Sequence, residues 1–317
     1  MQTQVMDVTL RDGGYLNDWK FERQAIMETC RFSQQLDIDK FEIGYVSDEN
    51  HRTLIDGCPV DFLEEVSSFF PREKMVGMLR PNEKNVLPVL RARAPYIGLI
   101  RIPTTPKSLS ATLELAEIVK SCGIEVSINI ILASLYSVEQ RHDLLQAIAA
   151  SKADLAYYAD SRGALLPADM EPLIAQAMDI WDRPFGFHAH NHLGHAIENS
   201  RIAIEQGCSY TDGSMNGYGY GGGNTRLGEL LALVSSGAVD DKIEAEIEAF
   251  CQQHLSLELP DEHYYHLCHL MALKNIDHEW MDNLLEQFDD RIESVLKALP
   301  KRPYTDSADV IALAASY

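Results

Sequence analysis

The segment Phe187-His188-Ala189-His190-Asn191-His192-Leu193-Gly194-His195 follows an apolar run and precedes a helix-like stretch. In a β-strand, residues i and i+2 point to the same face, so the imidazoles of His188 and His190 can converge on one point. Two imidazoles that converge at a strand end indicate a metal site with a third ligand elsewhere in the chain. His192 lies past the strand end and His195 falls in the following helix, so neither is expected to be a ligand.

Short β-like runs alternate with amphipathic helical runs from residue 5 to residue 235. This alternation is typical of parallel α/β architecture. Eight strand–helix units in this length fit a (β/α)8 TIM barrel better than an open sheet. The expected strands are 5–10, 40–45, 75–79, 97–102, 125–132, 155–159, 185–190 and 210–214; the expected helices are 21–36, 60–69, 86–94, 109–121, 137–150, 167–180, 196–206 and 225–235.

After Gly237 the pattern becomes helical throughout, with no convincing strand. We therefore predict a catalytic barrel domain over residues 1–237 and a helical extension over 238–317. The extension is expected to pack on the barrel or on a second subunit. Several apolar residues in this extension could form such a contact. We predict that they mediate a homodimer, and the alternative is that they pack against the barrel. They are Leu255, Leu257, Leu259, Leu267, Leu270, Met271 and Leu273.

The composition excludes several classes of protein. A formal net charge of −21 argues against nucleic acid as a partner, because such binding depends on cationic contacts to phosphate. No apolar run approaches the roughly 18 residues that a membrane helix needs. The first residues lack the basic and apolar regions of a signal peptide, so a cytoplasmic location is expected. The six cysteines are scattered without a CxxC spacing and are expected to be reduced.

The expected first strand ends in Thr9-Leu10-Arg11-Asp12-Gly13-Gly14. In a TIM barrel the functional residues lie at the C-terminal ends of the strands, so Asp12 is expected near His188 and His190. Two histidines and one carboxylate leave coordination positions open for substrate and water. Such a set suits a divalent ion such as Mn²⁺, Mg²⁺, Co²⁺ or Zn²⁺.

A glycine-rich loop, Gly217-Tyr218-Gly219-Tyr220-Gly221-Gly222-Gly223-Asn224, follows the last expected strand. So many glycines would be costly in a helix or strand, and they favour a loop that bends tightly over a ligand. Tyr218 and Tyr220 are therefore predicted to contact the substrate. Asn224 is predicted either to reach the metal or to cap the next helix.

Polar side chains inside apolar strands indicate a polar pocket, because burying them without a partner costs free energy. Glu42, Arg101 and Asn129 occur in the second, fourth and fifth strands. They are predicted to bind substrate inside the barrel, and salt-bridged or outward-facing positions are the alternative. Asp160 and Ser161 end the sixth strand and are predicted to orient a ligand or a metal-bound histidine.

Three motifs occur in order, at residues 7–14, 188–191 and 212–224: D-x-T-L-R-D-G, H-x-H-N, and D-x-S followed by the glycine-rich loop. Together they resemble the DRE-TIM metallolyase superfamily, which includes hydroxymethylglutaryl-CoA lyase, the isopropylmalate and homocitrate synthases, and the 4-hydroxy-2-oxoacid aldolases. The resemblance covers residues 5–235. It implies that Asp12, His188 and His190 bind the metal, with Asn224 as a further ligand. It also implies that Arg11 stabilises an enolate oxygen.

This chain departs from the pattern of that superfamily in two places, and the departures distinguish its branches. The lyase branch carries a catalytic cysteine in the glycine-rich loop, and this loop has none. The loop is closer to that of the aldolases, in which a histidine follows R-D-G and takes part in proton transfer. Tyr15 stands near that place here. Tyr15 is predicted to be catalytic, although its unperturbed pKa of about 10 makes it a better acid than base.

Three functions follow as hypotheses. The first is a metal-dependent class II aldolase that acts on a 4-hydroxy-2-oxo acid through a pyruvate-type enolate, with a 2-oxo acid and an aldehyde as its small-molecule partners. The second is a Claisen-type enzyme that joins an acyl-CoA to a 2-oxo acid. The third is a barrel that binds metal without catalysis.

Overall fold

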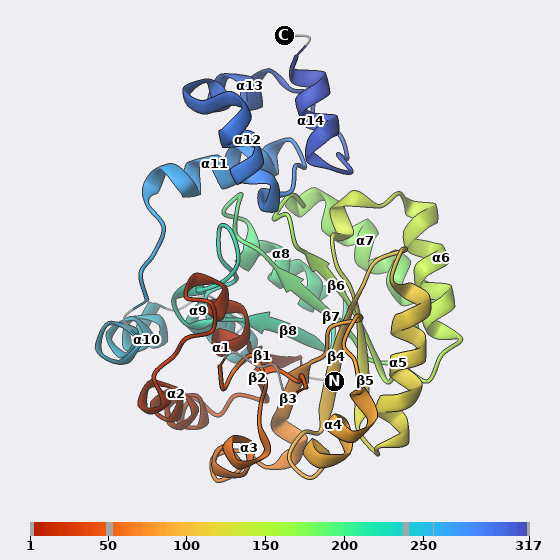
Figure 1. Ribbon diagram of the computed structural model, residues 1–317, viewed down its shortest axis with the longest axis vertical. Helices are drawn as coiled ribbons and strands as arrows, with labels where there is room; N and C mark the ends of the chain where they lie inside the picture. Colours follow the sequence, from red (N-terminus) through yellow and green to blue (C-terminus); the bar gives the residue numbers. More distant parts are fainter. Residues whose placement is uncertain (1–2, 49–52, 237–240, 256, 316–317) are drawn as a thin grey trace.

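Eight parallel strands close into a barrel in which each strand pairs with its neighbours in sequence and β8 pairs with β1 (Figure 1). The computed structural model describes residues 3–48, 53–236, 241–255 and 257–315. The barrel confirms the predicted (β/α)8 fold. The strands are β1 (Gln4–Asp7), β2 (Lys40–Tyr45), β3 (Met75–Met78), β4 (Leu99–Thr104), β5 (Glu125–Ile130), β6 (Leu155–Asp160), β7 (Phe185–Ala189) and β8 (Tyr210–Gly213).

Helices connect the strands and surround the barrel (Figure 1). Each presents an apolar stripe to the strands, as α5 does with Leu115, Ala116 and Val119. Local caps fix several boundaries; α6, for example, begins with a capping box between Ser137 and Gln140. The helices that follow the strands are α1 (Thr9–Asp12), α2 (Arg23–Gln35), α3 (Val60–Val66), α4 (Val86–Arg93), α5 (Leu109–Ser121), α6 (Val138–Ala149), α7 (Pro167–Ile180), α8 (Ala196–Glu205) and α9 (Leu227–Ser236); short 3-10 turns are η1 (Gly13–Leu16), η2 (Arg72–Lys74), η3 (Ala133–Leu135) and η4 (Met215–Gly217).

The first strand is shorter than predicted. It ends at Asp7 rather than Leu10, and Thr9–Asp12 form the helical turn α1. The cause is the carboxylate of Asp7, whose Oδ1 accepts hydrogen bonds from the Thr9 backbone N–H at 2.8 Å and from its hydroxyl at 2.5 Å. This local bond turns the chain out of the extended conformation. Arg11 and Asp12 therefore project from a turn above the strand rather than from the strand itself.

The barrel interior is layered. An apolar cluster fills one part of it, with Met6, Val76, Leu99, Leu155 and Tyr157 all buried. Charged side chains of the strands are buried next to this cluster. The layering matches the packed interior expected of a TIM barrel. The polar site therefore lies on top of an apolar layer of side chains.

The C-terminal region has two parts. Helix α10 (Asp241–His254) packs against the barrel wall, where Phe250 stacks on Phe32 of α2 with ring centroids 4.3 Å apart. The following helices share a separate hydrophobic cluster and are called here the C-terminal bundle. The predicted domain boundary at residue 237 lies outside the described residues. The bundle consists of α11 (Glu262–Leu273), η5 (His278–Trp280), α12 (Met281–Phe288), η6 (Asp289–Arg291), α13 (Ile292–Ala298) and α14 (Ser307–Ala314).

The apolar set predicted for a dimer lies mostly inside one chain. Leu267, Leu270 and Met271 are buried in the cluster of the C-terminal bundle, whereas Leu259 and Leu273 are exposed. None of the helices in the described ranges is both long and apolar enough to span a membrane.

The C-terminal bundle sits at one end of the barrel (Figure 1), and Arg162 fixes it there. This buried guanidinium donates to the carbonyl oxygens of Asn275 and Tyr304 at 2.7 and 2.9 Å, and it pairs with Asp277 at 3.4 Å. A side chain from the loop after β6 therefore joins two distant points of the bundle.

A buried histidine pair lies at the same junction. The ring of His278 packs against those of His192 and Tyr220, with centroids 4.8 and 3.9 Å away. In the described part of the chain, three nitrogens of this pair lack a hydrogen-bond partner: both ring nitrogens of His278, and Nε2 of His192. Burial, followed by His192, lowers the pKa of His278 to about 2, and burial, followed by His190, lowers the pKa of His192 to about 3.

We expect Arg162→Met to lower the free energy of unfolding by about 3 kcal/mol, because it leaves the buried Asp277 carboxylate without its cation and two carbonyl oxygens without this donor. Urea denaturation measures the loss. Arg302→Met is the control, since its ion pair with Asp309 is partly exposed and is expected to change stability by less than about 1 kcal/mol. Equal losses in the two variants would contradict the role of Arg162.

The buried histidines predict a loss of stability in acid. Their pKa values are lower in the folded than in the unfolded protein, so their contribution is complete above about pH 6.5 and falls as the unfolded chain takes up protons below it. Each histidine is expected to cost about 1 kcal/mol between pH 7 and 5.5. His278→Phe should remove the part of this pH-dependent loss of stability that His278 contributes. His142 is exposed, and His142→Gln should leave the pH dependence of stability unchanged. Denaturation curves at both pH values provide the measurement.

Candidate active site

A pocket of about 210 Å³ opens at the C-terminal ends of the strands. It collects side chains from the loops after most strands and from the C-terminal bundle, as expected for a TIM barrel. Nine of the predicted site residues line it: Arg11, Asp12, Tyr15, Arg101, Asn129, Ser161, His188, His190 and Tyr220.

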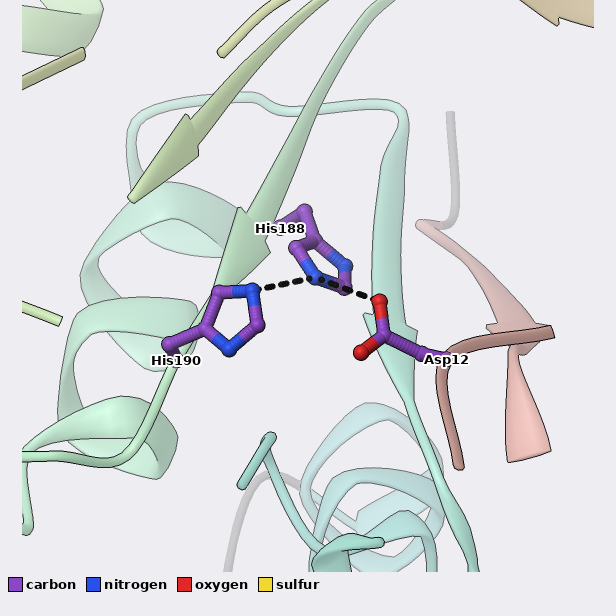
Figure 2. A group of neighbouring side chains, drawn as sticks. All are labelled: Asp12, His188 and His190. Atoms are coloured by element: carbon purple, nitrogen blue, oxygen red, sulfur yellow. Dashed lines mark hydrogen bonds and ion pairs between the residues drawn. The ribbon is translucent and has the colours of Figure 1, made fainter. Parts of the chain in front are cut away.

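Asp12, His188 and His190 each bring one ligand atom to within 4.8 Å of the others. His188 Nε2 is 3.2 Å from His190 Nε2 and 3.5 Å from Asp12 Oδ2. Figure 2 shows the two imidazoles and the carboxylate gathered around one point. All three residues are buried. This geometry is that of a two-histidine, one-carboxylate facial set.

Hydrogen bonds fix the tautomers of both histidines. His188 Nδ1 lies 2.9 Å from Asp212 Oδ2, and His190 Nδ1 lies 3.2 Å from the carbonyl oxygen of Tyr220. Both partners are acceptors, so each Nδ1 carries the hydrogen and each Nε2 of a neutral ring presents a lone pair. When both rings are neutral, these two lone pairs lie 3.2 Å apart and repel one another, and a cation bound between them would remove the repulsion. The donor set therefore fits a divalent metal ion.

The charges of the pocket keep the ligands in their metal-binding form. Burial opposes ionisation of Asp12, but Arg11, and then His190 and His188, hold the pKa of this carboxyl well below its usual value. Burial, followed by His188, lowers the pKa of His190 to about 3. Asp12 is thus an anion and His190 a neutral ring near neutral pH.

Arg11 lies beside the three ligands. Its Nη1 pairs with Asp12 and its Nε donates to Glu42 Oε2 at 2.5 Å. Burial opposes the charge, but these two carboxylates raise the pKa of Arg11 further. Within the described residues Nη2 has no partner, and Arg11 lines the pocket. This edge of the guanidinium can therefore donate to a ligand.

Beneath the pocket, Arg101 ties two carboxylates together. Its Nη1 donates to Glu42 Oε1 at 3.1 Å, and its Nη2 donates to Asp212 Oδ2 at 2.6 Å. Asn129 joins them: with its amide oxygen turned toward the guanidinium, that oxygen accepts from Arg101 at 2.9 Å. Glu42 is fully buried and does not line the pocket. It bridges the two arginines instead, which is the salt-bridged alternative foreseen for it.

Asp212 connects this ion network to the metal ligands. Burial opposes its ionisation, but Arg101 and His188 lower the pKa of the carboxyl. The ionised Asp212 then orients His188 through Nδ1. In the sequence Asp212 stands out only as part of a motif, whereas its contacts with Arg101 and His188 come from tertiary packing.

Asn224 lies beside His190 through a β-bridge rather than at a helix cap. Helix α9 begins at Leu227, so the helix-cap alternative is wrong. The side-chain amide donates to the carbonyl oxygen of Tyr218 at 3.1 Å. Its Oδ1 is buried and has no partner among the described residues. Asn224 does not line the pocket of Asp12, His188 and His190, so its role as a further metal ligand stays a prediction.

Tyr15 stands at the pocket rim, with its hydroxyl 2.9 Å from that of Tyr45. Its ring packs between those of Trp19 and Tyr220. Tyr15 is 41% exposed overall, yet its hydroxyl end is enclosed, and this burial together with Tyr45 raises the pKa of Tyr15. The phenol is therefore protonated and can act as a hydrogen-bond donor or acid.

The glycine-rich loop closes over the histidines. A Cβ on Gly221, which has a φ of +61°, would lie 2.6 Å from His192 Nε2, so only glycine fits. Tyr220 in this loop donates its backbone N–H to Asp12 Oδ1 at 3.0 Å. Tyr218, by contrast, points away from the pocket: its buried ring packs with residues of α9 and α10, such as Leu227.

Asp160 and Ser161 separate at the end of β6. Ser161 lines the pocket, and its hydroxyl accepts from the Leu132 N–H at 3.0 Å. Asp160 faces away and accepts from the N–H groups of Ala164 and Leu165 at 3.1 and 3.0 Å. Burial raises the pKa of Asp160 to about 7 despite these bonds. Its contacts hold the loop in shape.

Several lining residues carried no sequence signal. Tyr45 reaches the pocket because β2 bulges between Glu42 and Gly44, which breaks the alternation of its side chains. Asp277 and Glu279 come from the C-terminal bundle, whose helical pattern gives no hint of a pocket. The remaining unpredicted lining residues are Met78, Pro103, Ile131, Leu132 and Ala159.

Curated relatives are similar over most of the chain. A 4-hydroxy-2-oxovalerate aldolase from Geobacillus genomosp. 3 is 27% identical over 244 residues, covering 76% of this chain and 72% of the relative. A second, from Pelotomaculum thermopropionicum, is 25% identical and covers 74% of this chain and 70% of its own length.

Solved structures share the fold. The N-terminal domain of a candidate aldolase from Bacteroides vulgatus superposes with a TM-score of 0.78 at 26% identity, covering 93% of this chain and 100% of that one. The carboxyl transferase domain of Rhizobium etli pyruvate carboxylase has a TM-score of 0.72 at 17% identity, covering 94% of this chain and 55% of that one. The second likeness is one of fold alone.

Residues 2–248 match the model of the HMGL-like family. The match confirms the resemblance drawn from the three motifs. With the aldolase relatives, it also confirms the prediction of an enzyme that acts on carbon–carbon bonds. This chain belongs to the HMGL-like family.

Proposed function

We propose that this enzyme is a divalent-metal-dependent aldolase that makes or breaks the C3–C4 bond of a 4-hydroxy-2-oxo acid through a pyruvate-type enolate. The observation that carries the proposal is the convergence of two imidazole nitrogens and the Asp12 carboxylate beside Nη2 of Arg11, which has no partner among the described residues. The names of the aldolase relatives support the same reaction class.

Asp12, His188 and His190 would hold the ion, with Asn224 Oδ1 as a fourth donor. When bound, a divalent cation supplies Lewis acidity to the carboxylate and keto oxygens of a 2-oxo acid. Oxygen and imidazole donors suit Mn²⁺ or Mg²⁺, and they also accept Co²⁺ or Zn²⁺.

Arg11 would stabilise the enolate. When the C3–C4 bond breaks, its electron pair moves toward the keto group, and negative charge develops on the oxygen at C2. The free edge of the Arg11 guanidinium is fixed in place by Asp12 and Glu42. A donor held in advance where charge develops is typically worth about 3 kcal/mol of barrier.

Tyr15 would serve the other half of the substrate. In the bond-forming direction the aldehyde oxygen becomes an alkoxide and needs a proton. The protonated phenol of Tyr15, hydrogen-bonded to Tyr45, is a suitable donor at the rim of the pocket. In the cleavage direction the same transfer runs in reverse: the Tyr15 phenolate takes the 4-hydroxyl proton, and its raised pKa keeps that phenolate a small fraction of the enzyme at neutral pH.

The homodimer and the cytoplasmic location stay predictions.

Metal removal tests the proposal. We expect aldehyde release from 2-oxo-4-hydroxy acids to stop with EDTA and to return with Mn²⁺ or Mg²⁺. The exchange of pyruvate methyl protons in D₂O, which needs only enolate formation, should respond in the same way. Metal-replete protein that shows neither activity contradicts the aldolase, and release of free CoA thiol from an acyl-CoA and a 2-oxo acid would point to the Claisen-type enzyme.

Substitutions should separate the two halves of the reaction. Arg11→Lys loses the planar fork and is expected to lower both proton exchange and cleavage by about 100-fold. Tyr15→Phe keeps the ring contacts and is expected to lower cleavage by about 100-fold while lowering proton exchange far less.

Steady-state cleavage assays and proton exchange followed by NMR measure these effects. Arg201→Lys, in an exposed ion pair on α8, is the control for the arginine. If Tyr15→Phe lowered both activities equally, its assignment to the aldehyde half would be wrong.

A further inference from the structure

The pocket has two electrostatically different ends. At the buried end lie the metal-ligand set and two arginines. At the open end the polar atoms of the side chains are all oxygens. They are the hydroxyls of Tyr15, Ser161 and Tyr220 and the carboxylates of Asp277 and Glu279. The open end therefore offers acceptors and hydroxyl groups to whatever part of a substrate lies there.

Among the described residues that line the pocket, no cation lies at the open end. An anion that enters there would therefore meet the carboxylates without a positive charge to offset them. Arg11 pairs with Asp12 and Glu42, and Arg101 pairs with Glu42 and Asp212, both beneath or beside the metal ligands. Arg162, the cation next to Asp277, is buried and has all three of its nitrogens engaged in holding the bundle.

Of the two open-end carboxylates, Asp277 is committed to structure. It pairs with Arg162, and its Oδ1 accepts the N–H of Glu279 at 3.2 Å, which caps η5. Glu279 has no cationic partner in the described part of the chain. It is exposed at the rim, and its side chain accepts a hydrogen bond from the Tyr220 hydroxyl. A carboxylate accepts several hydrogen bonds, so one from Tyr220 leaves capacity for a ligand.

The position of Glu279 is tied to the catalytic centre. His278, the preceding residue, packs on the Tyr220 ring at 3.9 Å. The backbone of Tyr220 in turn donates to Asp12. Glu279 is therefore held at a defined place relative to the metal ligands by the same tyrosine that it contacts.

We propose that Glu279 is a specificity-determining residue that accepts a hydrogen bond from a hydroxyl or ammonium group on the aldehyde half of the substrate. This inference rests on the proposed aldolase function and names its acceptor class. The 2-oxo acid half carries the carboxylate and belongs at the cationic end, so the aldehyde half extends to Glu279. Hydroxylated or aminated aldehydes are favoured, and phosphorylated or carboxylated ones are repelled.

The test compares aldehydes in the condensation direction with pyruvate and Mn²⁺. Glyceraldehyde, 3-aminopropanal, propanal and glyceraldehyde 3-phosphate are the probes, and the ratios of their kcat/KM values are the readout. The wild-type enzyme should prefer glyceraldehyde or 3-aminopropanal over propanal, and the better of the two identifies the group that Glu279 receives. Glu279→Gln should lower that preference by about tenfold, because a charge-assisted hydrogen bond is lost.

Glu279→Lys should raise the kcat/KM ratio of glyceraldehyde 3-phosphate to glyceraldehyde by at least about tenfold. Glu286→Gln, an exposed position of α12 that does not line the pocket, is the matched control and should leave every ratio unchanged. Ratios that stay within about twofold in both Glu279 variants of an active enzyme would overturn this assignment alone. Absence of both pyruvate proton exchange and aldehyde release in the metal-replete wild-type protein would overturn the aldolase proposal and this inference with it.

Discussion

The buried ion network around Arg101 is the constraint on which the site depends. Arg101 from β4 pairs with Glu42 from β2 and Asp212 from β8. Through Glu42 the network reaches Arg11 and so Asp12; through Asp212 it reaches His188. Buried charges are tolerated when every one is paired, and removal of one leaves another uncompensated. Asp12 and His188, far apart in the sequence, are therefore held in one geometry by Arg101, which pairs with neither of them.

Much of this arrangement could be predicted from local patterns. The strands and helices followed apolar periodicity, and His188 and His190 shared a face because strand residues alternate. The failures have physical causes that lie outside such patterns. Asp7 ended β1 early through its bonds to Thr9. A bulge in β2 turned Tyr45 inward. Asp277 and Glu279 reached the pocket only through tertiary packing, which a helical pattern does not report.

The C-terminal bundle contributes to the site as well as to the fold. Arg162 anchors the segment that carries Asp277, and His278 packs beneath the glycine-rich loop against His192. Burying imidazole nitrogens without partners costs free energy. That cost is tolerated here because the same packing closes the loop and fixes Tyr220, whose backbone contacts Asp12 and His190. The bundle thus stabilises the loop that positions Asp12 and His190.

The two ends of the pocket are built from different kinds of structure. The cationic end rests on strands and on the ion network between them, where a single substitution disturbs several paired charges. The open end is built from loops and from η5, where side chains such as Glu279 make fewer contacts that stabilise the fold. Loops tolerate change better than the strands that carry them. A barrel of this design can therefore keep the proposed enolate chemistry while the residues at the rim adapt to a different aldehyde.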